Sequence, residues 1–168
     1  RITITGEAFN VYVFLEISSL ASYALISVRR DPRALKPAYK YLIMGTIGAT
    51  FILIAVGLMY MMTGTLNMAD LAQRVKMVED TRTILMAFAF LSIGIMLKIA
   101  LFPMHAWLPN AYSYAPSLVT AFIAATSTKV SLYVFLRFVF TIFGAEYAFD
   151  TLRFNEVLLP LAILGIVV

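Results

Sequence analysis

The sequence has no cysteine, a single histidine and few charged residues. Of its 168 residues, 9 are acidic and 13 are basic, so only 13% of the chain is charged, whereas 62% is hydrophobic. Without cysteine there can be no disulfides, no thiolate-ligated iron–sulfur clusters and no cysteine-rich zinc sites. A soluble domain needs more charge than this to cover its surface. We therefore expect no metal site, no cofactor and no catalytic or redox centre in this chain, and a bilayer as its main solvent.

The hydrophobic residues form runs long enough to cross a bilayer, whose hydrocarbon core of about 30 Å requires about 20 helical residues. The spans are predicted at residues 8–28, 41–62, 83–112, 116–143 and 157–168. The predicted fold class is an all-α, polytopic transmembrane helix bundle in which residues 1–168 are part of a single domain. Because the chain begins at Arg1 rather than Met and stops inside a hydrophobic run, we expect it to be an internal fragment of a longer protein.

The third run is too long for one straight span. Residues 83–112 would form a helix about 45 Å long, which exceeds the hydrocarbon thickness without a strong tilt. Pro103 and Pro109 both lie in its second half, and each removes a helical hydrogen bond. We therefore predict a discontinuous helix that is broken near its middle.

The loops predict the orientation of the chain in the membrane. Residues 29–40 carry five basic residues and one acidic residue, residues 63–82 are neutral, and residues 144–156 are acidic. Cytoplasmic loops are enriched in lysine and arginine, so the 29–40 loop is predicted to be cytoplasmic, in a prokaryotic inner membrane. The net charge of +4 is explained by this loop and does not indicate a nucleic-acid partner. Within the second loop, Asn67 is predicted to cap a short interfacial helix.

Three ionisable residues lie near the centres of predicted spans: Glu16, Lys98 and Lys129. A charge at the centre of a membrane helix costs roughly 2.5–3.5 kcal/mol on insertion scales. Burial disfavours the charged form of both carboxylates and lysines. A lysine whose pKa lies near neutral pH can bind and release a proton, as an arginine cannot. A structural alternative is that each lysine reaches the interface or simply pairs with a carboxylate. The occurrence of three such residues favours a proton pathway.

The surroundings of the two lysines support the same interpretation. Lys98 lies five residues before Pro103, where freed carbonyls and water can collect. Lys129 lies in a polar patch, residues 126–131, inside an otherwise apolar span. Histidine as a residue type can bind and release a proton near neutral pH, so His105 is predicted to relay protons between the lysines; alternatively, it hydrogen-bonds a carbonyl freed by a proline. Trp107 is assigned to packing or to the membrane interface.

Several segments resemble one family of membrane proteins. The segment from Lys98 to Ala121, KIALFPMHAWLPNAYSYAPSLVTA, is followed by TKVSLY at residues 128–133 and preceded by FLE at residues 14–16. These motifs resemble the proton-conducting antiporter-like subunits of respiratory complex I, membrane-bound hydrogenases and Mrp-type Na⁺/H⁺ antiporters. The segments at residues 63–71 and 110–112 are more similar to the D-type subunit of Mrp antiporters. Tyr112 stands where complex I members often carry a second histidine.

The resemblance implies a proton pathway through Glu16, Lys98 and Lys129, with His105 as the family histidine. It also implies that the chain is a fragment of a larger subunit built from two inverted halves, with other membrane subunits as partners. The leading hypothesis is a proton-translocating subunit of a multisubunit Na⁺/H⁺ antiporter. The alternative is the proton-pumping membrane subunit of an NADH:quinone oxidoreductase or hydrogenase, which would be part of a translocase without a catalytic centre of its own.

Overall fold

The computed structural model describes residues 2–28, 32–78, 81–151 and 153–167. This part of the chain contains no β-strand, only one isolated bridge between Glu7 and Asn67. The helical elements are α1 (Ala8–Ser27), α2 (Pro32–Thr63), α3 (Met68–Arg74), η1 (Val75–Met77), α4 (Thr81–Ile99), α5 (Leu108–Tyr114), α6 (Ser117–Arg137), η2 (Phe138–Phe143), η3 (Tyr147–Thr151) and α7 (Phe154–Val167). The predicted all-α fold is confirmed.

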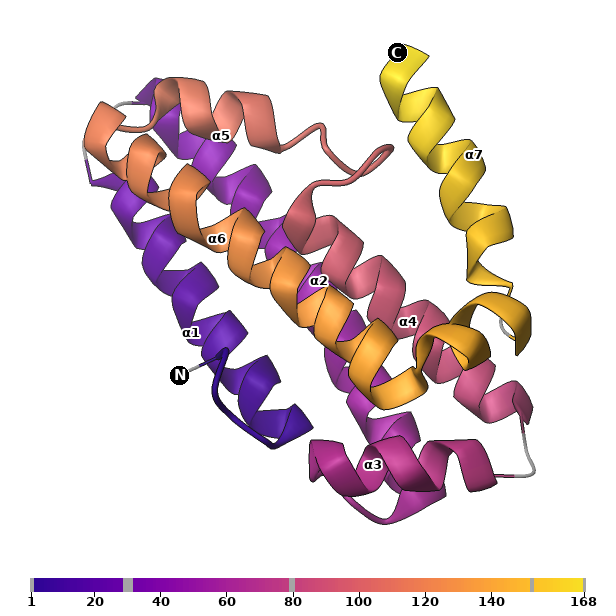
Figure 1. Cartoon of the computed structure of the whole chain (residues 1–168). Coiled ribbons are helices and arrows are strands. Elements are labelled where there is room, and N and C mark those ends of the chain that lie inside the picture. The colour runs from indigo at the N-terminus through magenta and orange to yellow at the C-terminus, as the bar shows by residue number, and fades with distance from the viewer. Residues whose placement is uncertain (1, 29–31, 79–80, 152, 168) are drawn as a thin grey trace.

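Four helical segments are long and apolar enough to cross a membrane within the described residues: α1, α2, α4, and α6 together with η2. They run side by side, whereas α3 lies across one end of the bundle and α5 across the other (Figure 1). The last helix, α7, has only 14 residues and most of its apolar side chains are exposed. The arrangement is that of a polytopic membrane bundle, as the sequence predicted.

Helices α2 and α4 approach each other closely at a pair of facing glycines, Gly48 and Gly94. A Cβ atom at Gly94 would lie 2.6 Å from the main-chain oxygen of Gly48, and one at Gly48 would lie 2.9 Å from the oxygen of Gly94. Small residues allow two membrane helices to approach this closely. Ile52 and Leu91 are buried in the same core. The two glycines therefore set the spacing between α2 and α4.

The predicted break lies between α4 and α5 and begins three residues before Pro103. Helix α4 ends with Ala100 in the left-handed conformation, at φ 60°. The amide of Leu101 donates to the carbonyl of Met96 at 3.0 Å, and the amide of Ala100 donates to that of Leu97 at 3.3 Å. This pair of bonds is the Schellman motif that commonly ends helices, usually with glycine at the left-handed position. The motif, and not the proline itself, ends the helix.

The start of α2 differs from the prediction. The helix begins at Pro32 rather than near residue 41, so most of the predicted 29–40 loop is helical; Arg29, Arg30 and Asp31 lie outside the described residues. Pro37 lies inside the helix, close to its first turn. The helix starts early because its first turns bury a face: Ala34, Pro37, Ala38 and Tyr41 are all buried and recur at helical spacing.

The ends of α1 and α3 are tied together by main-chain hydrogen bonds. The amide of Ala8 donates to the carbonyl of Leu66 at 2.9 Å, and the amide of Met68 donates to the carbonyl of Gly6 at 2.8 Å. Each bond satisfies an amide that the start of a helix leaves without an internal partner. Asn67 caps α3 as predicted, with its side-chain oxygen accepting the amide of Ala69 at 3.0 Å. We call the pair of main-chain bonds the α1–α3 clamp.

Candidate functional site

Glu16 and Lys98 form an ion pair in the interior of the bundle. The Nζ atom of Lys98, in the last turn of α4, lies 3.2 Å from a carboxylate oxygen of Glu16 on α1. The side chains of Lys98 and Glu16 are only 6% and 20% exposed. The carbonyl end of α4 favours a cation at this position. The structure thus brings together two of the three ionisable residues that the sequence placed within spans.

Ser19 is a second partner of the ammonium group and was not predicted from the sequence. Its hydroxyl oxygen accepts a hydrogen bond from Lys98 at 2.8 Å and donates one to the carbonyl of Leu15 at 2.9 Å. Ser19 lies three residues after Glu16, so both face the same side of α1. That spacing is a signal that could have identified it.

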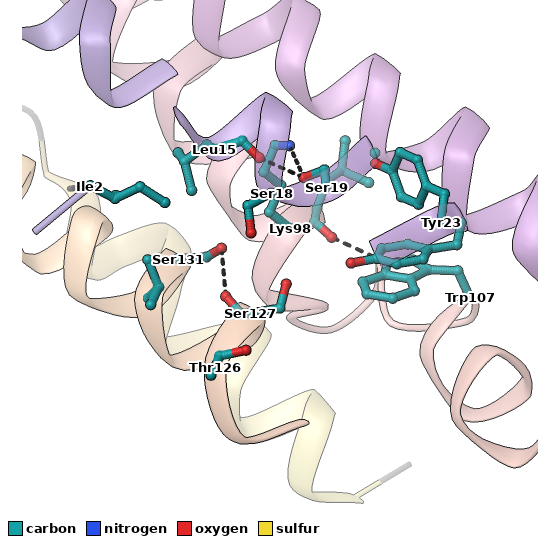
Figure 2. A pocket seen from close by; sticks show the side chains of 14 residues that line it. Ile2, Leu15, Ser18, Ser19, Tyr23, Lys98, Trp107, Thr126, Ser127 and Ser131 are labelled. Carbon is teal, nitrogen blue, oxygen red and sulfur yellow. Dashed lines mark hydrogen bonds between the residues drawn. The ribbon is translucent and has the colours of Figure 1, made fainter. Parts of the chain in front are cut away.

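A small cavity of about 50 Å³ adjoins the ion pair, between α1, α2, α4 and α6. Figure 2 shows Lys98 directed toward Ser19 of α1, with Ser127 and Ser131 of α6 on the other side of the cavity. The residues that line it include the polar side chains of Ser18, Ser19, Tyr23, Lys98, Ser127 and Ser131. A water molecule requires roughly 10–15 Å³ of such space together with polar partners, so the cavity can hold more than one.

The hydroxyl of Tyr23 is a further polar atom at this cavity that needs a partner. It is buried and makes no hydrogen bond with any other described residue. Leaving a buried hydroxyl without a partner is costly, whereas a water molecule in the cavity would satisfy it. The cavity is therefore suited to hold water beside the ammonium group of Lys98.

An aromatic stack closes the cavity on the side of the helix break. The rings of Tyr41 and Trp107 stack with centroids 4.3 Å apart, and Tyr23 meets Tyr41 edge-on at 4.6 Å. The indole nitrogen of Trp107 donates to the carbonyl of Leu97 at 3.1 Å. Trp107 is buried and packs inside the bundle, which is one of the two roles predicted for it, and it also lines the cavity. The stack fixes the segment after the break against α2.

His105 lies in the same connection but does not line the cavity. Its ring stacks on Phe102, with centroids 5.6 Å apart, and its Nδ1 atom is buried without a hydrogen-bond partner among the described residues. The main-chain oxygen of Leu97, in the last turn before the break, accepts a hydrogen bond from Trp107 and not from His105. The structure therefore leaves one ring nitrogen of His105 available for water or for a rearranged neighbour.

Lys129 is exposed and lies apart from the Glu16–Lys98 pair. Its Nζ atom donates to the carbonyl of Ala124 at 2.7 Å, and it lines an open groove of about 350 Å³ together with Tyr112 and Thr128. The neighbouring Ser127 lines the cavity on the Lys98 side. Helix α6 thus separates the two lysines, and its polar patch contributes side chains to both compartments.

No group of three or more histidine, aspartate or glutamate side chains able to hold a metal ion occurs within the described ranges. The cavity is also far smaller than the several hundred Å³ of a typical small-molecule site. What this arrangement can do chemically is to hold water and to exchange protons among an amine, a carboxylate and hydroxyl groups.

Comparisons with known proteins point to one family. The chain is 52% identical, over 136 residues, to NADH-quinone oxidoreductase subunit N of Desulforudis audaxviator, covering 81% of this chain and 27% of that protein. It is 34% identical, over 164 residues, to the D-type subunit of the Na(+)/H(+) antiporter of Bacillus subtilis, covering 98% of this chain and 32% of that protein. The chain therefore spans a third or less of the length of these relatives.

A solved structure supports the same relationship. The archaeal membrane-bound sulfane sulfur reductase, described as a respiratory membrane complex, contains a chain that superposes with a TM-score of 0.78 at 36% identity, covering 82% of this chain and 28% of that one. The sequence model of the transmembrane family named NADH:quinone oxidoreductase/Mrp antiporter matches residues 6–168. Together with the membrane bundle and its buried ion pair, this match shows that the chain belongs to the NADH:quinone oxidoreductase/Mrp antiporter family of integral, multi-pass membrane subunits.

Proposed function

We propose that this chain is the proton-carrying part of a membrane subunit, in which Lys98 binds and releases a proton under the control of Glu16. One observation carries the proposal: a buried amine is bonded to a carboxylate and a hydroxyl beside a polar cavity large enough for water. An ammonium group has three donors, and Glu16 and Ser19 use two of them. The third donor can bond to a water molecule in the cavity, and that water molecule can accept the proton.

Glu16 is the controlling element in this proposal. A carboxylate 3.2 Å from the amine influences how firmly the amine holds its proton. A small movement of α1 relative to α4 would change that distance, and with it the proton affinity of Lys98. Ser19 would retain the amine during the exchange through its bond of 2.8 Å.

The route beyond the cavity crosses α6. Ser127 and Ser131 line the cavity, whereas Thr128, Tyr112 and Lys129 line the groove on the other side. In our proposal, protons leave Lys98 through cavity water, pass the polar patch of α6 and reach Lys129. His105, whose Nδ1 atom is unbonded within the described chain, acts as a relay near the break. Hydroxyl groups and water can pass protons from the cavity to the groove because each of them both donates and accepts hydrogen bonds.

The proposed setting is a multisubunit complex in a prokaryotic inner membrane, with other membrane subunits as partners and the basic start of α2 in the cytoplasm. Coupling to Na⁺ efflux is the candidate that the sequence motifs favoured. Redox-driven pumping is the second candidate, favoured by the 52% identity to a subunit named as part of an NADH-quinone oxidoreductase, against 34% for the antiporter subunit.

The proposal is tested with the full-length protein in its complex, reconstituted in vesicles that contain a pH-sensitive dye. Lys98→Ala is expected to abolish proton movement after a pH jump, and Lys129→Ala to reduce it strongly. Lys98→Arg is the decisive variant, because an arginine can keep the ion pair with Glu16 but cannot release its proton. Lys76→Ala, at an exposed lysine of η1, is the matched control.

A purely structural ion pair predicts a different result. Lys98→Arg would then retain proton movement, and Lys98→Ala would lower only the thermal stability of the complex. Either outcome with correctly assembled protein would contradict the proposal. The two candidate settings separate in the same vesicles, because an antiporter acidifies or alkalinises the lumen on addition of Na⁺ alone, whereas a redox-driven pump requires an electron donor and acceptor.

A further inference from the structure

A basic groove lies at the start of α2, away from the ion pair. It has a volume of about 330 Å³, and Arg33, Lys36, Lys40, Asn110 and Tyr114 are among the residues that line it. The three basic residues are spaced by three and four positions, so they lie on one side of the helix. Within the described chain, every charged residue lining this groove is basic. The groove is therefore complementary to an anion.

The length of α2 places this groove at the level of lipid headgroups. The helix has 32 residues, which correspond to about 48 Å, whereas the hydrocarbon core is about 30 Å thick. The apolar part of α2 follows Lys40, so the first turns extend beyond the hydrocarbon. Lys36 and Lys40 are exposed on these turns, where long basic side chains reach phosphate groups readily.

A second, mainly apolar groove continues from the first toward the membrane interior. It has a volume of about 360 Å³, and its lining includes Lys40, Ile43, Met44 and Trp107. Lys40 lines both grooves. From Lys36 to Ile43 the helix rises about 10 Å, so a molecule in both grooves would have a negative end at the headgroup level and an apolar end in the hydrocarbon.

We propose that the two grooves together bind an anionic phospholipid. Its phosphate would lie against Lys36 and Lys40, with Arg33 alongside, and one acyl chain would lie in the apolar groove over Ile43 and Met44. Basic pockets between membrane helices are suited to phospholipid headgroups. The adjoining apolar groove favours a lipid over a soluble phosphate ion, because the ion has no apolar part that could occupy the groove.

The test uses the full-length protein in detergent micelles, with bound lipid counted by native mass spectrometry during titration with phosphatidylglycerol. The double variant Lys36→Gln/Lys40→Gln is expected to weaken binding by about fivefold for each lysine removed. Lys76→Gln changes an exposed lysine of η1 and should leave the affinity unchanged. Phosphatidylcholine, with the same chains but no net charge, should bind weakly and equally to all of these variants.

The apolar groove is tested separately by Ile43→Trp, which fills it, against Leu53→Trp at another exposed position of α2. Only the first should weaken phosphatidylglycerol binding. Glycerol 3-phosphate, which offers the headgroup without chains, should not displace the lipid. Circular dichroism checks that each variant is folded, and the single lysine variants replace the double one if it is not. Wild-type affinity in the lysine variants would overturn the proposal, as would displacement by glycerol 3-phosphate with no effect of Ile43→Trp.

Discussion

The indole nitrogen of Trp107 donates a hydrogen bond to the main-chain oxygen of Leu97 over 3.1 Å, and that oxygen also accepts the amide of Ala100. Because Leu97 precedes Lys98, the bond holds the turn of α4 that carries the buried amine. A face of the indole ring is covered by Tyr41 of α2. One side chain after the break therefore links α2 to the last turn of α4.

Replacing Trp107 with Phe should destabilise the break by removing this bond while keeping an aromatic ring on Tyr41. We expect the free energy of unfolding to fall by about 1–2 kcal/mol, the usual cost of losing one buried hydrogen bond and some packing. The measurement is unfolding of the full-length protein by SDS titration, followed by far-ultraviolet circular dichroism. If Trp107 positions Lys98, the rate of proton movement should also fall in protein that is still folded. A wild-type rate in the destabilised variant would show that Trp107 does not position Lys98.

Ala100→Gly should stabilise the protein, the opposite of what this substitution does within a helix. Ala100 has φ 60°, and the left-handed conformation costs an L-residue roughly 1–2 kcal/mol that glycine does not incur. We expect a gain of about 1 kcal/mol in the same unfolding assay. Ala89→Gly, at an exposed position inside α4, is the matched control and should lose about 1 kcal/mol. If both variants were destabilised alike, the Schellman ending of α4 would be in error.

The ion pair should show strong coupling in a double-mutant cycle of Glu16→Gln and Lys98→Met. Removing one partner of a buried pair leaves the other uncompensated and costs about 3 kcal/mol or more. Replacing both should cost much less than the sum of the single changes, because no buried charge remains. Unfolding titrations of the four proteins give the coupling energy. Additive effects would mean that the two side chains do not interact in the membrane.

The contact between α2 and α4 predicts that Gly94 does not tolerate a side chain. In Gly94→Ala the new Cβ atom would lie 2.6 Å from the oxygen of Gly48, so the helices must separate, at a cost of about 1–3 kcal/mol. Gly57→Ala, also in a spanning helix, has no atom within 4 Å of the added Cβ. It should be neutral or slightly stabilising. Similar losses in both variants would exclude steric contact as the cause.

Physical reasoning from the sequence anticipated the interior of this protein better than its helix ends. The cost of charge in lipid singled out Glu16 and Lys98, and the structure places them 3.2 Å apart. The same reasoning provided no information about Ser19, because a serine costs little to bury and its role depends on the neighbouring helix. Its position one turn after Glu16 was the available signal.

Two other features depended on information that hydropathy does not contain. Charge and proline predict a loop up to about residue 40, but α2 begins at Pro32, because buried residues at helical spacing run from Ala34 to Tyr41. The separation of Lys98 from Lys129 by α6 follows from how α6 is turned, with Ser127 and Lys129 lining different compartments. A helix with polar residues at successive positions does not reveal which side each neighbour will occupy.

The α1–α3 clamp has a consequence for the distance between Glu16 and Lys98. From Ala8, where the clamp holds α1, the helix rises about 12 Å and turns roughly 100° per residue to reach Glu16. The clamp therefore sets both the depth and the azimuth of the carboxylate, from the far end of its own helix. Inserting a single alanine between these two positions would rotate the carboxylate, and Ser19 with it, about a quarter of a turn from the amine, without replacing any residue of the site.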